Sequence, residues 1–514
     1  MKKENYILIA TVIACLFACS SKALDSTLTI RHIIFCVSTL SLCSCLFLKK
    51  RKNLSVLNLV IMLVFTGYCI IATLSIAKAT NIADSFYSVL TAWTSLLLLI
   101  CVASFADKDL ISKYIVYAGM VFAICVGIQI LKAGHTVLSM KGLGFTCGRN
   151  LLSSTLILLL PFALYRKDKM AVLTRVLIIL DIICLQTRSV YLGLFAASFF
   201  LIPGKKIKIS LVIVAISLVV FTARFKSSLS LEYRMQSWRH TVSMLLQNPV
   251  IGGGAGNWKI FAPQKGNVVS IDGVQCFHQR AHNDFLETFS EIGFLGGTLY
   301  ALIFAFAIYY STKTRDKRLG LAMRFGFICY IAFAMFSFPK ERATHTLLFI
   351  TMLGIVLSNI KMRKEWHTRN INLLWISGIV IIPLLFINVK RNSAEIYSKE
   401  IFTFRRDKEY QKVIDVIDEN YSPFAPMVNY AVTPIKMYRA EANFYLGRDN
   451  EAFNDYSEAY KLHPNHPAIL TNLGYYMIKH RKYDEARKLY TRADSIFPDQ
   501  PFITNTLKKL KQRQ

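Results

Sequence analysis

The chain has 514 residues, of which 54% are hydrophobic, and its mean hydropathy is +0.40. Soluble proteins of this length are markedly less apolar, so the composition excludes an ordinary soluble enzyme and indicates an integral membrane protein. The formal net charge of +30 does not indicate nucleic-acid binding. Much of that charge lies in short loops between apolar segments, where basic residues mark the cytoplasmic side of a membrane.

Apolar segments of membrane-spanning length recur along most of the chain and predict an all-α, polytopic fold with about thirteen spans. The predicted spans are 6–20, 29–48, 54–76, 87–106, 110–131, 150–165, 170–187, 189–203, 207–223, 285–311, 322–338, 343–360 and 371–389. Residues 1–22 also resemble a signal peptide, and LFAC at 16–19 resembles a lipoprotein cleavage site. Phe17 is bulky for that site, so an uncleaved first span is the preferred interpretation.

The loop charges predict the orientation of these spans. If the N-terminus is cytoplasmic, every strongly basic short loop falls on the cytoplasmic side: 49–52, 166–169, 204–208, 313–318 and 361–369. Two large parts then lie outside, a loop at roughly 224–284 and everything after residue 390. We therefore expect a membrane domain at 1–390 and an extracytoplasmic domain at 391–514.

The sequence contains 12 cysteines, and nearly all fall inside apolar spans, where they serve as small packing residues. Cys147 and Cys276 are exceptions, because both lie in predicted outer loops. A disulfide between them stays open, since the sequence does not give their separation.

The region after residue 390 is polar, rich in tyrosine and helical in period. It repeats a pattern of small residues, aromatics and a terminal proline every 34 residues. The matching positions are Ala440, Ala452, Tyr456, Ala459 and Pro464, then Gly474, Ala486, Tyr490, Ala493 and Pro498. This spacing predicts a tetratricopeptide (TPR) array with a degenerate first unit at 395–426. Such an array either presents a groove to a partner protein or packs against the membrane domain.

The predicted outer loop begins with a segment of helical period at 232–247, with Arg234 and Arg239 off its apolar stripe. NPVIGGGAGNW follows, at 248–258. Its glycines allow either a close backbone approach to a ligand or a simple connection.

Charged side chains gather at the predicted outer mouths of several spans. His282 and Asn283 precede the span at 285–311, Arg188 lies in the hairpin before 189–203, and Arg342 precedes 343–360. Snorkelling explains one such arginine but not several beside a histidine. Arginines bind phosphates through paired hydrogen bonds, and histidine transfers protons near pH 7. The pattern favours a site for a diphosphate-linked lipid, at which His282 orients or deprotonates an attacking hydroxyl.

These motifs resemble the O-antigen ligase and polymerase superfamily of bacterial envelope enzymes. The resemblance rests on QNPVIGGGAGNW, on AHNDFLETFSEIGFLGG at 281–297, on TRSVYLG at 187–193 and on GFTCGRNLL at 144–152. The last segment retains Asn150, whereas Arg149 stands where similar sequences often have proline.

The resemblance implies a GT-C-like helical membrane fold and a metal-independent, inverting transfer of glycan from undecaprenyl diphosphate, with no cofactor. It implies His282 as the catalytic residue, and it places the enzyme in the bacterial inner membrane with a periplasmic site. The implied substrate-binding residues are Arg188, Arg234 or its rival Arg239, Arg342, Asn283 and Asn150.

Several alternatives stay open. The expected acceptor is the lipid A core, as for an O-antigen ligase, but the same donor chemistry serves an oligosaccharyltransferase acting on protein Ser or Thr, or a glycan polymerase. A transporter or flippase is a further alternative, although no inverted repeat is visible. A zinc site would use His278 and His282 at helical spacing, and DKD at 107–109 resembles a metal-binding Asp-x-Asp. A protein partner of the TPR region and membrane lipid are expected partners; nucleic acid is not.

Overall fold

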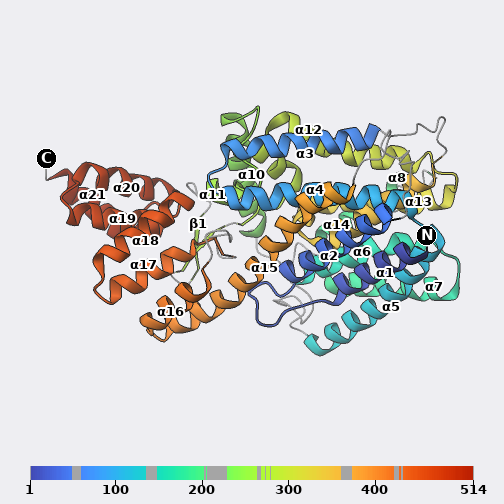
Figure 1. Cartoon of the computed structure of the whole chain (residues 1–514), viewed down its shortest axis with the longest axis horizontal. Coiled ribbons are helices and arrows are strands. Elements are labelled where there is room, and N and C mark those ends of the chain that lie inside the picture. Colours follow the sequence, from blue (N-terminus) through green and yellow to red (C-terminus); the bar gives the residue numbers. More distant parts are fainter. Residues whose placement is uncertain are drawn as a thin grey trace.

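The computed structural model describes residues 2–48, 60–134, 148–201, 204, 229–262, 268–271, 274–277, 279–360, 373–421, 428–429 and 432–512. These residues are predominantly helical (Figure 1). The first helices are α1 (Lys2–Phe17), α2 (Leu28–Leu48), α3 (Val60–Ser75), α4 (Ile82–Phe105), α5 (Lys108–Ala133), α6 (Arg149–Tyr165), α7 (Lys169–Leu185) and α8 (Arg188–Leu201). After the predicted outer loop come α12 (Asp284–Ser311), α13 (Lys317–Ala334), the 3₁₀ turn η4 (Pro339–Glu341), α14 (Ala343–Ser358) and α15 (Leu373–Arg406).

Among the described residues, 6 helices are long and apolar enough to cross a membrane. They are α2, α3, α4, α5, α12 and α15, and shorter apolar helices include α6, α8 and α14. Every predicted span except 207–223, which lies outside the described residues, coincides with a helix. These helices support a multi-pass helical membrane protein, while the number of spans and their orientation stay predictions.

The helices of the membrane domain pack in a way that brings distant segments together. Helix α2 packs against α15, α3 against α12, α4 against α14, and α8 against α13. Small residues permit the close approaches: a Cβ added at Gly354 of α14 would overlap Val102 of α4. Small interface residues have this role in membrane helices, whose association depends on close packing rather than on water exclusion.

Helix α12 is broken one third of the way along, at Ile292 and Gly293. The break leaves backbone carbonyls without helical partners, and the glycine turn (residues 249–256) supplies them. The Gly253 N–H donates to the Ser290 carbonyl (3.0 Å), and the Gly254 N–H donates to the Glu291 carbonyl (2.9 Å). A Cβ at Gly252 would overlap the Glu291 backbone. The glycines thus let the turn approach α12 closely and donate hydrogen bonds to its free carbonyls. A broken membrane helix needs such partners for its backbone groups.

The predicted outer loop contains α10 (Leu229–Gln247), α11 (Trp258–Phe261) and two short strands, β1 (Val268–Ile271) and β2 (Val274–Phe277). The strands form an antiparallel hairpin, which departs from the all-α expectation. Such short strands form because of cross-strand pairing, which the periodicity of the sequence does not reveal. Cys147 lies outside the described residues, so the question of a disulfide with Cys276 stays open.

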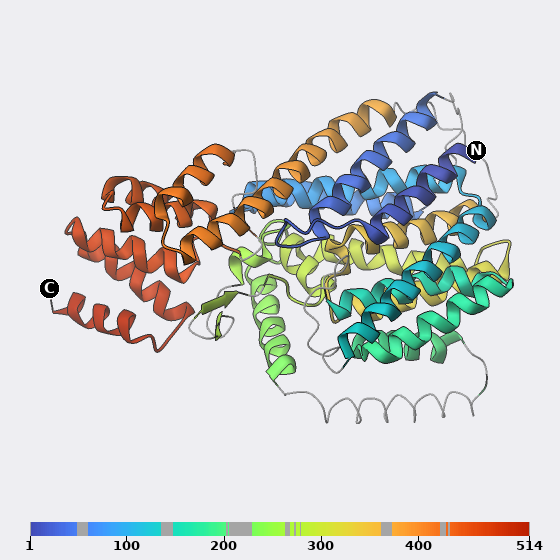
Figure 2. The same cartoon turned by 90° about the horizontal axis from the view of Figure 1, so that it is seen from below.

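The C-terminal helical region comprises α16 (Tyr410–Asn420), α17 (Ile435–Tyr445), α18 (Asp449–Leu462), α19 (Pro467–Lys479), α20 (Tyr483–Ile496) and α21 (Pro501–Lys511). Figure 2 shows it at one end of the molecule, with α15 leading into it. The predicted boundary at residue 390 therefore falls inside a continuous helix. The small and aromatic repeat positions are buried where helices pair, and the two prolines are half-buried. Gly474 lies against the Tyr490 ring. The assignment of these pairs to the TPR class stays a prediction.

The C-terminal helical region also touches the outer loop. The Asn465 side-chain amide donates to the Ile260 carbonyl of α11 at 3.0 Å. Ile260 packs with Val428 and Val432, and all three are almost fully buried. This contact supports the packing alternative raised by the sequence without excluding a partner groove.

Candidate functional site

The segment before α12 is held by its own backbone geometry. Asn283 caps the helix, because its side-chain oxygen accepts from the N–H groups of Phe285 and Leu286, each at 3.1 Å. His282 has a positive φ of 54° and is half-buried, with its ring edge-on to Phe338 at 5.3 Å between centroids. A non-glycine residue rarely adopts this backbone conformation, and such strain is concentrated at functional sites. The sequence-predicted Asn283 thus has a structural duty beside His282.

Arg342 shares the Phe338 ring with His282. Its guanidinium lies over that ring at 5.6 Å from the centroid and forms an ion pair with Asp25 at 2.6 Å. Arg342 is 7% exposed. This predicted substrate-binding arginine therefore already has a buried carboxylate partner, from a residue far away in the sequence.

Three arginines, here called the arginine cluster, come from three helices: Arg149 opens α6, Arg188 opens α8, and Arg234 lies on α10. The charge of Arg188 acts on both Arg149 and Arg234. Burial, and then the Arg188 charge, lowers the pKa of Arg234. Like charges gathered in this way are stabilised by a bound anion.

Helix α10 connects the arginine cluster to His282. The Trp238 indole donates to the Ala281 carbonyl at 2.9 Å, and its ring lies 5.9 Å from that of Phe336. Arg234 precedes Trp238 by one helical turn, so the same helix face leads from the arginine cluster to the residue before His282. The rival Arg239 is exposed, as is Asn150. Of the two arginines that the sequence left open on α10, Arg234 is the one on which the charge of Arg188 acts.

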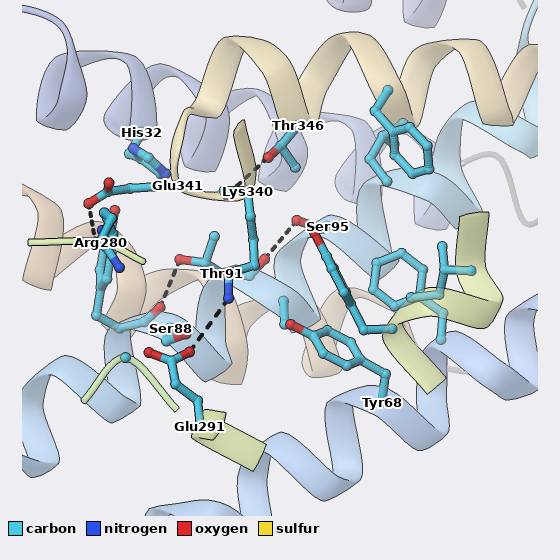
Figure 3. Close-up of a pocket in the computed structure, with 18 of the residues that line it drawn as sticks. His32, Tyr68, Ser88, Thr91, Ser95, Arg280, Glu291, Lys340, Glu341 and Thr346 are labelled. Atoms are coloured by element: carbon cyan, nitrogen blue, oxygen red, sulfur yellow. Dashed lines mark hydrogen bonds and ion pairs between the residues drawn. The ribbon is translucent and has the colours of Figure 1, made fainter. Parts of the chain in front are cut away.

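A group of paired charges, here called the ionic layer, lies beside this segment and consists of Arg280, Glu287, Glu291, Lys340 and Glu341. Arg280 pairs with Glu287 at 3.2 Å. Arg280 also pairs with Glu341, and Lys340 pairs with Glu291 at 3.5 Å (Figure 3). Burial opposes charge on Glu341, but Arg280 and Arg342 prevail and lower its pKa to about 2. The layer fixes the segment 280–283 to η4 through the Arg280–Glu341 pair. It also fixes this segment to α12, because the Glu287 carboxylate accepts from the Ala281 N–H at 2.9 Å.

Every member of the ionic layer except Glu287 lines a cavity with a volume of about 100 Å³ (Figure 3). The rest of the wall includes the aromatic residues Tyr68, Tyr87, Tyr300, Tyr330 and Phe304 and the hydroxyls of Ser88, Thr91 and Ser95. Sequence reasoning missed this cavity, because its walls come from helices far apart in the chain. The available signal was a set of tyrosines and hydroxyls inside apolar spans.

Another charge cluster on the cavity wall ties the outer loop to two membrane helices. Asp84 of α4 pairs with Lys259 of α11 at 2.9 Å and with Arg391 of α15 at 3.7 Å. The Arg391 guanidinium also lies 4.0 Å above the Tyr87 ring. Both cations therefore already have a carboxylate partner within the cavity wall.

A metal site has no support from the part of the chain that the structure describes, where no group of three or more His, Cys, Asp and Glu residues could hold an ion. His278 lies outside that part, so its pairing with His282 is untested. Asp107 of the DKD sequence caps α5 through hydrogen bonds from the N–H groups of Asp109 and Leu110.

The model of the O-antigen ligase family matches residues 173–301, a range that includes Arg188, Arg234 and His282. No curated protein matches the chain. The family match supports a broad O-antigen ligase or polymerase type of function, with glycan and lipid substrates in general.

Proposed function

We propose that this protein is an O-antigen ligase-type glycosyltransferase that moves a glycan from undecaprenyl diphosphate to an acceptor at the periplasmic side of the bacterial inner membrane. The observation that carries the proposal is the convergence of Arg188 and Arg234, through Trp238, on the segment that holds His282. All these residues lie in the range matched by the ligase family. The orientation rests on the loop charges.

In the proposed reaction, an acceptor hydroxyl attacks the anomeric carbon of the donor sugar. The new C–O bond forms as the bond to the diphosphate oxygen breaks, which inverts the anomeric centre. The arginines hold the diphosphate and stabilise the negative charge that it carries away. No metal is needed for that charge, because guanidinium groups remain protonated at any physiological pH.

His282 takes the proton of the attacking hydroxyl or orients that hydroxyl by a hydrogen bond. Its position suits this task, because Phe338, the Asn283 cap and the ionic layer hold its backbone and ring. Preorganised groups of this kind need little rearrangement when the reaction occurs.

The lipid A core is the proposed acceptor. A protein acceptor is the second candidate, and the specific observation in its favour is the docking of the C-terminal helical region on α11 through Asn465. That contact brings a helical-repeat surface to the loop that carries the site. The donor chemistry is the same in both cases.

The test compares wild type with His282→Ala in cells that lack the native gene. A gel of surface polysaccharide and a blot for glycosylated envelope proteins are read together, with His480→Ala in the exposed part of the C-terminal helical region as the matched histidine control. Loss of mature lipopolysaccharide in His282→Ala alone supports the ligase. Loss of glycoproteins alone assigns a protein acceptor. If membrane-inserted His282→Ala retains both products, the proposed role of His282 is wrong.

A further inference from the structure

We infer that Arg149 and the N-terminus of α6 form a third arm of the diphosphate site, beside Arg188 and Arg234. This inference rests on the proposed function and names a substrate-binding residue that similar sequences do not predict. Arg149 stands at a position where they often have proline.

A buried hydrogen bond fixes the start of α6 beside the start of α8. Ser153 lies one helical turn after Arg149, and its hydroxyl hydrogen-bonds the Thr187 hydroxyl at 2.8 Å. Ser153 and Thr187 are 0% and 3% exposed, so this contact belongs to the packed interior. Thr187 directly precedes Arg188 in the chain. The backbones that carry Arg149 and Arg188 are therefore held next to each other, rather than meeting through flexible side chains.

Electrostatics then sets the half-buried Arg149 and Arg234 apart from several other cations near the site. Arg280, Lys340, Lys259 and Arg342 each face a carboxylate. Within the described ranges, Arg149 and Arg234 form no ion pair, and one terminal nitrogen of Arg149 is buried without a hydrogen-bond partner. The Arg188 charge repels both. Positive groups kept together in this way call for an anion, which would turn the repulsion into attraction.

Helix α6 adds its own positive end. It has 17 residues and begins after Gly148, whose φ is 84° and which makes no side-chain cap. The first N–H groups of a helix attract anions through their unused hydrogen bonds and the helix dipole. Arg149 is the first residue of this helix, so its side chain and these N–H groups belong to one end of one element.

The chemistry of the site matches a diphosphate better than a single carboxylate. A diphosphate carries several acceptor oxygens and more than one negative charge, and three guanidinium forks from three helices can share it. As the diphosphate leaves, these groups receive the charge. Arg149 is accordingly expected to contribute chiefly to donor binding, with the bond-making step left to His282.

The experiment measures binding of undecaprenyl diphosphate to the purified full-length protein in lipid nanodiscs, with undecaprenyl monophosphate as a second probe. The variants are Arg149→Gln and Arg149→Lys. The matched control is Arg175→Gln, because Arg175 donates within its own helix to the Ala171 carbonyl at 3.1 Å. Arg149→Gln is expected to weaken diphosphate binding about tenfold. Arg149→Lys should bind the diphosphate more weakly than wild type and more tightly than Arg149→Gln, because an ammonium group keeps the charge but lacks the guanidinium fork. The Arg175→Gln variant should bind like wild type.

Thermal unfolding of the ligand-free variants separates binding from folding. Loss of Arg149 relieves repulsion, so Arg149→Gln should unfold at the same temperature as wild type or slightly higher. Wild-type affinity in Arg149→Gln, with weakened binding in Arg188→Gln, would overturn the third arm and leave the proposed function standing. If the wild-type protein itself fails to bind the diphosphate, the proposed donor is wrong.

Discussion

His282 occupies a backbone conformation that costs stability and that neighbouring contacts maintain. Because its φ is positive, substitutions of His282 can separate the role of its side chain in glycan transfer from the effect of its backbone conformation on stability. His282→Gly should leave the unfolding temperature unchanged or higher, because glycine adopts this conformation freely, yet it should abolish glycan transfer. His282→Val should lower the free energy of unfolding by about 1–3 kcal/mol, because a β-branched side chain suits this region poorly. Unfolding scans and polysaccharide gels on both variants check this. A stable His282→Gly protein that retains full transfer would contradict it.

Glu341 predicts how the site responds to acid. Its pKa is lowered from the usual 4.5 to about 2 in the folded protein, so its ion pairs add stability above pH 4.5. As the pH falls from 4.5 toward 2, the unfolded state takes up a proton before the folded state, and that stability is lost. The unfolding temperature of wild type should therefore drop across this window. Glu341→Gln should start lower and show a smaller drop, because Arg280 has lost one of its two carboxylates. Parallel pH profiles would contradict this account.

At the scale of elements, the break in α12 and the glycine turn form one unit. Gly293 has φ 73° and ψ −179°, a region that essentially only glycine adopts, and a Cβ there would overlap the Val250 carbonyl. Gly293→Ala should lower the free energy of unfolding by about 3 kcal/mol or more. It should also reduce glycan transfer, because the glycine turn could no longer pack against α12. Gly378→Ala on α15 is the matched control, since its Cβ would meet only Ile382 at 3.9 Å. Unfolding in detergent checks both variants, and equal stabilities would contradict the assigned role of the break.

At the scale of the whole molecule, the C-terminal helical region should steady the outer loop. Asn465 accepts a hydrogen bond from Arg492 at 2.7 Å while its amide binds the Ile260 carbonyl. Asn465→Ala should therefore speed amide hydrogen exchange in 258–262 without changing exchange in the membrane helices. Asn420→Ala, at an exposed helix end, serves as the control. Unchanged exchange in 258–262 would show that the contact does not restrain the loop.

The sequence predicted the features that have a local period, and it missed the contacts between residues far apart in the chain. Apolar stretches located the helices. Asn283 was expected only to bind substrate, and the structure shows that it caps α12. The pairing of Arg342 with Asp25 could not be predicted, because the two residues are 317 positions apart. For the same reason, the sequence did not reveal the cavity beside the ionic layer or the contact between the glycine turn and α12. The glycine run was open to two interpretations, a ligand loop or a simple connection, because its partner, a broken helix, reads as one continuous span.

Asp84 has a consequence for any attempt to exchange parts between proteins of this kind. One carboxylate on α4 serves as counter-ion to Lys259 in the outer loop and to Arg391 on the helix that leads into the C-terminal region. A chimera that imports a foreign C-terminal region from α15 onward would bring its own residue to position 391 and change the charge balance around Lys259. Grafting should therefore work best when the junction lies after Arg406, where α15 ends. Asp84 then keeps both of its partners, Lys259 and Arg391.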